Sequence, residues 1–115
     1  MSDKIIVMNR GDTYYFTLTI SDSDGNTYLL HHEDAVYFGV MNPHQRFEDA
    51  LIKKKLTADD MNEDGSITIS LKPADTLDLY PGTYYYAVKL HRVAKADDID
   101  DVITVINKTK LIIND

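Results

Sequence analysis

Runs in which apolar and polar residues alternate dominate the chain. In Thr13–Ile20 every second residue is apolar or aromatic, beginning at Tyr14. Because successive side chains of a strand point to opposite faces, this spacing predicts a strand that is buried on one face. The same spacing predicts strands at Ala35–Met41, Ser66–Leu71 and Thr83–Val93. Weaker alternation predicts further strands at Lys4–Met8, Thr27–Leu30, Leu51–Leu56 and Val102–Ile113, the last with a break near Asn107.

Turn-forming residues fall between these runs. Asp22–Asn26 and Asn62–Gly65 each contain an Asp-Gly pair, and both residue types tolerate the backbone conformations of hairpin turns. Pro73–Leu79 fits one short helical turn, with the proline at a position in the first turn where it is allowed. The acidic segment Ala94–Asp101 is expected to form a mobile loop between the last two long strands.

Seven or eight short strands within 115 residues predict a single all-β domain that spans residues 1–115. The expected architecture is an immunoglobulin-like antiparallel β-sandwich of seven to eight strands with one short helical turn. From the alternation, the residues expected in its core include Phe16, Leu18, Tyr84, Tyr86 and Val88.

Composition narrows the chemistry. The chain has no cysteine, which excludes disulfides, cysteine-ligated metal centres and thiol nucleophiles. Its formal net charge of −7 disfavours a general role in binding the phosphate backbone of nucleic acids. We expect neither a secretory signal nor a membrane span, because the apolar runs are too short. No nucleophile elbow or phosphate-binding loop is found, so we expect neither enzyme activity nor a cofactor.

Three blocks follow one another along the chain in a recognisable order. Arg10–Thr13 opens the first long strand with Gly-Asp-Thr, and an acidic glycine hairpin and the apolar step Tyr28–Leu30 follow it. Ala35–Val40 is a strand of alternating apolar residues, and Leu79–Val88 enters a late strand through Pro-Gly-Thr-Tyr. In order and spacing, these blocks resemble the N-terminal immunoglobulin-like domain of phage baseplate upper proteins and related domains of phage and prophage tail proteins.

The resemblance implies a non-enzymatic structural role, in which the sandwich docks onto other subunits of a phage or prophage tail or baseplate. The implied partners are other phage structural subunits and further copies of the chain, with no nucleic acid and no membrane. Without a signal peptide, the chain would assemble in the host cytoplasm and end in the virion tail. It departs from the family at His31–Asp34, where Thr-Gly is usual. Full-length members also continue beyond the position of Asp115, so a stand-alone subunit and an attachment module both fit.

The candidate interface residues lie on strand faces opposite the main apolar stripes. Tyr15, Tyr37 and Tyr85 could present an aromatic patch to a protein or a sugar, or bury their rings near the rim of the sandwich. Lys53 and Lys55 could form a docking patch for an acidic neighbour, or guard an edge strand against unwanted pairing.

The main alternative function is a soluble module that binds carbohydrate or calcium. Asp22, Asp24 and Asn26 place oxygen ligands in one loop, and Glu33 stands where calcium loops have a bidentate glutamate. A simple hairpin turn explains the same residues, so no metal site is predicted. His31–Asp34 also contains metal-type side chains, but neighbours in an extended segment point in opposite directions, which favours a solvated loop.

Overall fold

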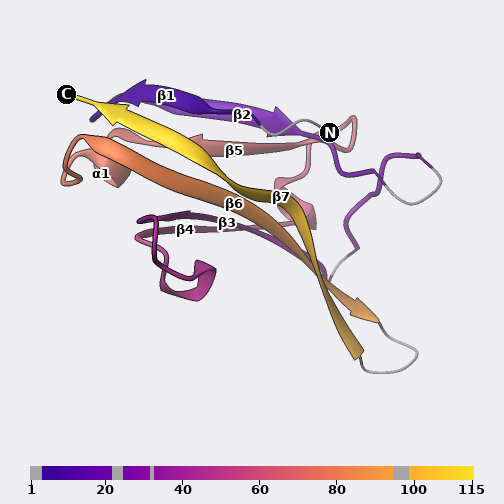
Figure 1. Ribbon diagram of the computed structural model, residues 1–115. Helices are drawn as coiled ribbons and strands as arrows, with labels where there is room; N and C mark the ends of the chain where they lie inside the picture. Colours follow the sequence, from indigo (N-terminus) through magenta and orange to yellow (C-terminus); the bar gives the residue numbers. More distant parts are fainter. Residues whose placement is uncertain (1–3, 22–24, 32, 95–98) are drawn as a thin grey trace.

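Figure 1 shows two β-sheets packed face to face in a computed structural model. The structure describes residues 4–21, 25–31, 33–94 and 99–115, with 93, 94 and 99–101 described in their backbone alone. One sheet has the strand order β1-β7-β6-β3-β4, and the other pairs β2 with β5. The strands are β1 (Ile6–Asn9), β2 (Tyr14–Leu18), β3 (Ala35–Met41), β4 (Ile52–Thr57), β5 (Ile67–Leu71), β6 (Gly82–Ala94) and β7 (Ile99–Asn114).

The strand order confirms the predicted all-β sandwich. The row β7-β6-β3-β4 opposite β2-β5 corresponds to strands G-F-C-C′ and B-E of an immunoglobulin-like sandwich. The expectation of a wholly antiparallel fold is wrong at one edge, because β1 runs parallel to β7 with Ile6 opposite Leu111. Parallel neighbours need a long crossover, and here the whole intervening domain supplies it.

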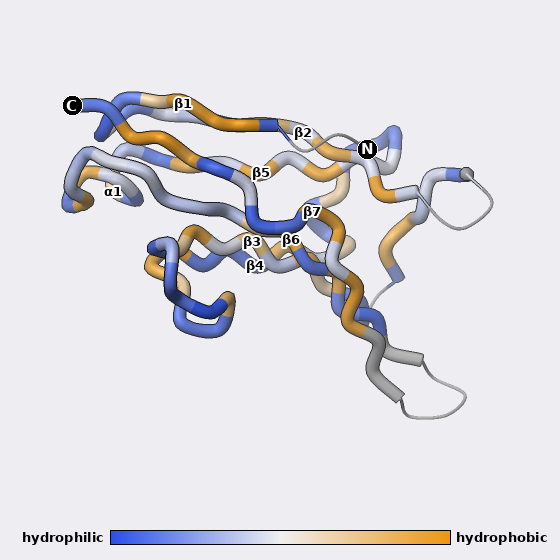
Figure 2. Tube along the Cα trace, in the orientation of Figure 1, coloured by the Kyte–Doolittle hydropathy of each residue, from blue (hydrophilic) through white to orange (hydrophobic). Residues whose placement is uncertain are grey.

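The core lies between the inward faces of the two sheets. Val36, Phe38 and Val40 of β3 are at most 1% exposed, and Ile67 and Ile69 of β5 are 1% exposed. Figure 2 shows the hydrophobic residues concentrated along the strands, whereas the connection between β3 and β4 is mostly hydrophilic. The core is therefore built by the alternation that the sequence displays.

Four of the five expected core residues are buried, namely Leu18, Tyr84, Tyr86 and Val88. Phe16 is only half-buried, although its ring packs against the core. The reason is that the second sheet has only two strands. β2 pairs with β5 on one side, so the Phe16 side chain is open to solvent on the other side.

One predicted strand and the extent of one predicted loop are wrong. Thr27–Leu30 is not a strand, because only Thr27 pairs, in an isolated bridge with Ser21. The loop expected at Ala94–Asp101 is shorter than predicted, since β6 continues to Ala94 and β7 begins at Ile99; residues 95–98 lie outside the described part. β6 and β7 thus extend beyond the ends of their neighbours as a long hairpin (Figure 1).

The break expected near Asn107 is a bulge within one continuous strand, because β7 runs from Ile99 to Asn114 and only its pairing with β6 is irregular there. Tyr86 pairs with Thr109 and Val88 with Ile106, so β7 carries one extra residue in this interval. Such a bulge bends the strand and changes the direction of its side chains. Lys108 lies in this interval of β7, between the paired residues Ile106 and Thr109.

The connection between β5 and β6 confirms the predicted helical turn as α1 (Pro73–Thr76). The Thr76 hydroxyl accepts a hydrogen bond from the Gly11 N–H at 2.8 Å, which ties α1 to the turn after β1. At the start of β6, the Tyr84 hydroxyl donates to the Tyr80 carbonyl oxygen at 2.6 Å. This is the tyrosine corner found at the equivalent place in immunoglobulin-like sandwiches.

Candidate functional site

The outer face of the five-stranded sheet brings together most of the candidate interface residues. Lys55 of β4, Tyr37 of β3 and Lys89 of β6 are cross-strand partners in one row. Lys53 lies two residues further along β4, and Tyr85 of β6 pairs with Lys110 of β7. We call this surface the basic face, and its members are Tyr37, Lys53, Lys55, Tyr85, Lys89 and Lys110.

The side chains of the basic face point away from the core because they alternate with buried residues. Tyr37 lies between Val36 and Phe38, which are 0% and 1% exposed. The three residues at the margins of the face, Lys53, Lys55 and Lys110, are exposed, and the three central ones are half-buried. The face therefore combines accessible charge with a partly covered aromatic centre.

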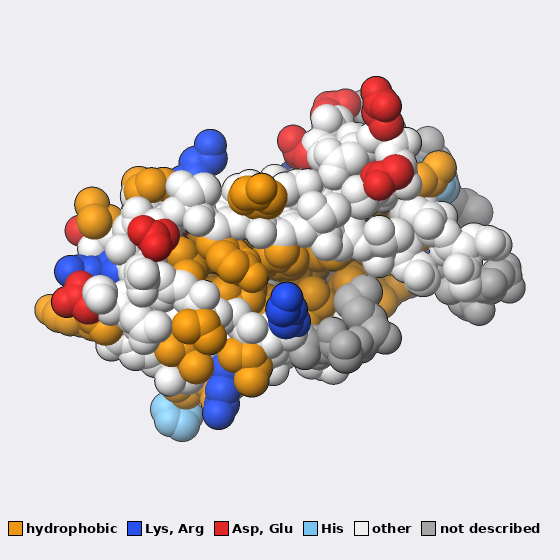
Figure 3. Space-filling model, turned by 90° about the horizontal axis from the view of Figure 1, so that it is seen from above, with side chains coloured by type: hydrophobic (Ala, Val, Ile, Leu, Met, Phe, Trp, Pro, Cys, Tyr) orange, Lys and Arg blue, Asp and Glu red, His pale blue; other side chains and the backbone are white. Residues whose placement is uncertain are grey.

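The charge of the basic face is opposite to that of the whole chain, which is −7. Strands in a sheet lie about 4.8 Å apart, so lysines two strands apart are about 10 Å from each other, slightly more than the screening length of about 8 Å at physiological salt. Their combined field favours an acidic partner, most strongly at low salt. In the view from above, several acidic side chains gather at one end of the molecule, whereas basic side chains lie at separate places (Figure 3).

A short turn between β3 and β4 covers the centre of the basic face. This turn is the 3₁₀ helix η1 (Phe47–Asp49), and the Phe47 ring lies over Gly39, where an added Cβ would come within 3.1 Å of it. The Lys89 amine lies 4.8 Å from the centre of the same ring, a cation–π contact. Lys108 Nζ donates to the Gln45 carbonyl oxygen at 2.6 Å and anchors the loop to β7.

A shallow pocket of about 330 Å³ lies beside η1, between the loop and strands β6 and β7. Its lining includes Lys89, Lys108 and Arg46, together with Glu48. Arg46 Nε lies 3.4 Å from Asp49 and 3.9 Å from Glu48, so the acidic groups of the loop have a basic neighbour of their own. Three basic side chains and one acidic side chain therefore line the pocket, which adds to the basic character of this side of the sheet.

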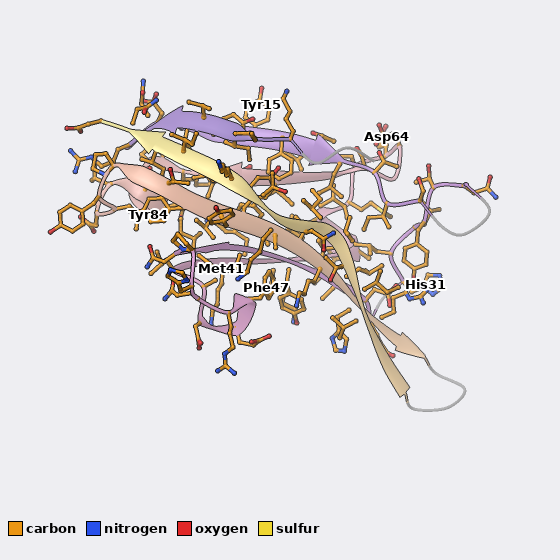
Figure 4. The ribbon with its side chains drawn as sticks, in the orientation of Figure 1. Tyr15, His31, Met41, Phe47, Asp64 and Tyr84 are labelled. Atoms are coloured by element: carbon orange, nitrogen blue, oxygen red, sulfur yellow. The ribbon has the colours of Figure 1, made fainter. Side chains whose placement is uncertain are left out.

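The structure thus places four of the five candidate interface residues on one face and the fifth on another. Tyr15 is 68% exposed on the outer side of β2, on the opposite side of the sandwich from Phe47 (Figure 4). Lys89 and Lys110 were not among the candidates, although Lys89 follows the same alternation as Tyr85. These residues meet because of the order of the strands in the sheet, and the alternation within each strand does not indicate that order.

The position of β4 confirms that the lysine run lies on an edge strand, because β4 ends the five-stranded sheet. Between the outward-facing Lys53 and Lys55, Lys54 turns inward and its Nζ lies 2.7 Å from Asp75 Oδ2 of α1. Burial raises the pKa of Asp75, but bonds from Lys54 and from the Lys72 N–H outweigh it and lower the pKa below its ordinary value. An inward-pointing charge of this kind also discourages unwanted edge pairing.

The histidine-rich segment forms a closed loop around Asp34, which is 3% exposed. The Asp34 carboxylate accepts hydrogen bonds from the Tyr28 hydroxyl at 2.5 Å and from the His31 N–H at 2.9 Å. Burial, together with the bond to Asp34, raises the pKa of Tyr28 to about 12. These bonds curl residues 28–31 away from strand geometry, which is why the strand predicted there does not form.

The candidate calcium ligands are not gathered into a site by the part of the chain that the structure describes. Asp22 and Asp24 lie outside the described residues, and Asn26 is exposed. Within the described ranges, no group of three or more His, Asp or Glu side chains could hold a metal ion. His31 stacks on Tyr28 with ring centres 5.7 Å apart, and His44 is exposed in the loop after β3.

Comparisons with known proteins add no family to this description: no family model matches the chain, and no curated protein is similar to it. Among the described residues, no helix has the length and apolar character needed to cross a membrane.

Proposed function

We propose that the chain is a non-enzymatic structural subunit of a phage or prophage tail or baseplate, which docks through the basic face onto other subunits, including further copies of itself. The phage assignment rests on the resemblance of three sequence blocks. The observation that supports docking is the meeting of Tyr37, Lys53, Lys55 and Tyr85 on one outward face. Such a subunit would assemble in the host cytoplasm and end in the virion tail.

The charge of the basic face restricts how copies can meet. Two basic faces brought together about a two-fold axis would place like charges opposite each other, which is unfavourable. The chain as a whole is acidic, at −7, so another part of its surface can supply the complementary charge. A contact between two different surfaces is head-to-tail, and it closes into a ring when its rotation allows.

The mass of the protein in solution tests this proposal. We expect light scattering over a concentration series to show a defined oligomer that is unaffected by calcium and weakened by salt. A strict monomer up to about 1 mM, the limit of weak association, would contradict self-association. A monomer whose melting temperature rises with calcium would instead favour the calcium-binding module.

Two variants of equal charge change locate the contact. Lys53→Gln with Lys55→Gln removes two positive charges from the basic face. Thr13→Glu with Thr19→Glu adds two negative charges at exposed positions flanking β2. We expect the lysine pair to dissociate the oligomer and the threonine pair to leave it intact. Equal effects would mean that net charge, rather than the basic face, controls association.

A further inference from the structure

The second sheet lacks a strand at the edge of β5. In an immunoglobulin-like sandwich of constant type, strand D pairs with E on this side, and β5 occupies the place of E. Here the chain passes from β4 to β5 through the 3₁₀ helix η2 (Ala58–Asp60) and a tight turn. Among the described residues, only Met61 pairs with this edge, in an isolated bridge with Ile67 at its beginning.

The backbone of β5 presents hydrogen-bonding groups along this open edge. The Asn62 N–H donates to the Ser66 carbonyl oxygen on the same side as the bridge. Backbone groups of a strand alternate between its two sides, so those of Thr68 and Ser70 lie on this side of β5. The Thr68 N–H borders the bridge, so the groups open to another strand are the Thr68 carbonyl oxygen and the N–H and carbonyl oxygen of Ser70. They comprise one donor and two acceptors.

A slot of about 330 Å³ runs between this edge and the edge of β4. Its lining includes Thr68 and Ser70 of β5 and the four lysines Lys53, Lys54, Lys55 and Lys72. The five residues of β5 span about 17 Å at the usual rise of a strand. Because Met61 bridges Ile67 at one end, the other four residues leave about 13 Å of edge for a short extended segment.

One acidic residue, Asp60, lines the slot, and Asp75 of α1 lies near it. Asp75 holds Lys54, and Asp60 accepts the Thr57 N–H at 2.9 Å. The amines of Lys53, Lys55 and Lys72 form no ion pair within 4 Å with the described residues, and all three side chains are exposed. Four lysines line the slot against Asp60 and the nearby Asp75, which also acts on Lys72, so a net positive charge remains beside the unfilled strand position.

From this geometry we infer that an acidic, extended segment of a partner protein adds to β5 as a third strand. Its backbone would bond to Thr68 and Ser70, and its carboxylates would meet the slot lysines. Strand addition draws affinity from the backbone and specificity from the side chains. The phosphates of a nucleic acid offer acceptors for the N–H groups but no donors for the carbonyl oxygens, so a peptide fits this edge better. This inference goes beyond the proposed function, because it concerns a different edge and a different partner, although Lys53 and Lys55 border both surfaces.

A synthetic peptide tests the inference directly. The probe is a nine-residue peptide of alternating aspartate and valine, capped at both ends and added to the full chain. We expect binding with a Kd on the order of 10–100 µM, as for weak strand addition. Amide exchange measured by NMR should slow at Ser70, whose N–H faces the open edge. A peptide with asparagine for aspartate should bind at least tenfold more weakly, and so should one with alternate backbone nitrogens methylated on the pairing side.

Two protein variants separate the slot from the rest of the basic face. Lys55→Gln with Lys72→Gln should weaken the aspartate peptide at least tenfold, whereas Lys110→Gln, which lies away from the slot, should not. The methylated peptide is made in two forms, each with one of the two sets of alternate backbone nitrogens blocked. If both forms bind as tightly as the unmethylated peptide, the peptide is only adsorbed to the charge, and strand addition is overturned. Unchanged exchange at Ser70, or no binding up to about 1 mM, would also overturn it. Self-association is measured without peptide, so each proposal can fail alone.

Discussion

Phe16 and Tyr15 are neighbours on β2 that face opposite sides of the sandwich, and alanine at each position tests that assignment. The Phe16 ring centre lies 6.0 Å from those of Phe38 and Tyr86. Replacing a fully buried phenylalanine by alanine costs about 3–5 kcal/mol, so the half-buried Phe16 should cost about 2–3 kcal/mol. Tyr15 is 68% exposed, and its replacement should cost less than about 0.5 kcal/mol.

Urea unfolding followed by far-ultraviolet circular dichroism measures both changes. We expect Phe16→Ala to lower the unfolding midpoint without altering the slope m, since the change lies in the native packing. Phe16→Leu keeps much of the apolar volume and loses the ring contacts, so it should fall between wild type and Phe16→Ala. A loss for Tyr15→Ala as large as that for Phe16→Ala would show that the two faces of β2 are exchanged.

Four further changes test other parts of the molecule. Tyr84→Phe removes the bond of the tyrosine corner and should lower the unfolding free energy in urea by about 1–2 kcal/mol; no change would mean that the bond is dispensable. Gly65→Ala should lower the melting temperature more than Gly25→Ala, because both glycines have positive φ but only at Gly65 would the added Cβ lie 2.7 Å from a leucine side chain. Asp75 has a lowered pKa in the fold, so its carboxylate stabilises the fold above the unfolded value of 3.8 and loses this effect as the pH falls through the folded pKa. Urea midpoints of wild type and Asp75→Asn should therefore differ at neutral pH and converge in acid. The pKa of Tyr28 is raised from 10.0 to about 12, so the stabilisation of the fold by its hydroxyl is complete below pH 10 and is lost between pH 10 and 12. Thermal melts of the wild type should show this loss, and those of Tyr28→Phe should not.

Local alternation predicted strands best where tertiary contacts agree with it. Ala35–Met41 is β3 to the residue, because its inward side chains enter the core and Pro43 follows soon after. Thr27–Leu30 shows similar alternation, but the carboxylate of Asp34 closes a loop there. That contact depends on a residue outside the run, so the pattern within the run could not indicate it.

The basic face was predictable in its residues but not in its extent. Alternation alone places Tyr37, Lys53, Lys55 and Tyr85 away from the apolar stripes. Their meeting depends on β3 lying between β4 and β6, a long-range arrangement. The same strand order adds Lys110 to the face, and it leaves β5 without a partner on the side where the lysines gather.

Edge protection and docking, the two readings of the lysine run, are compatible in this structure. A lysine-rich edge repels a second copy of itself and gives a neutral strand no favourable charge contact, which protects the open sheet. An acidic strand reverses the sign of that interaction, since each carboxylate relieves repulsion among lysines that are otherwise close together. The discrimination therefore arises from penalties against the wrong partner as much as from attraction to the right one. Lys54 is paired with Asp75, so it adds no unpaired ion to the slot, and the discrimination is left to the exposed lysines around it.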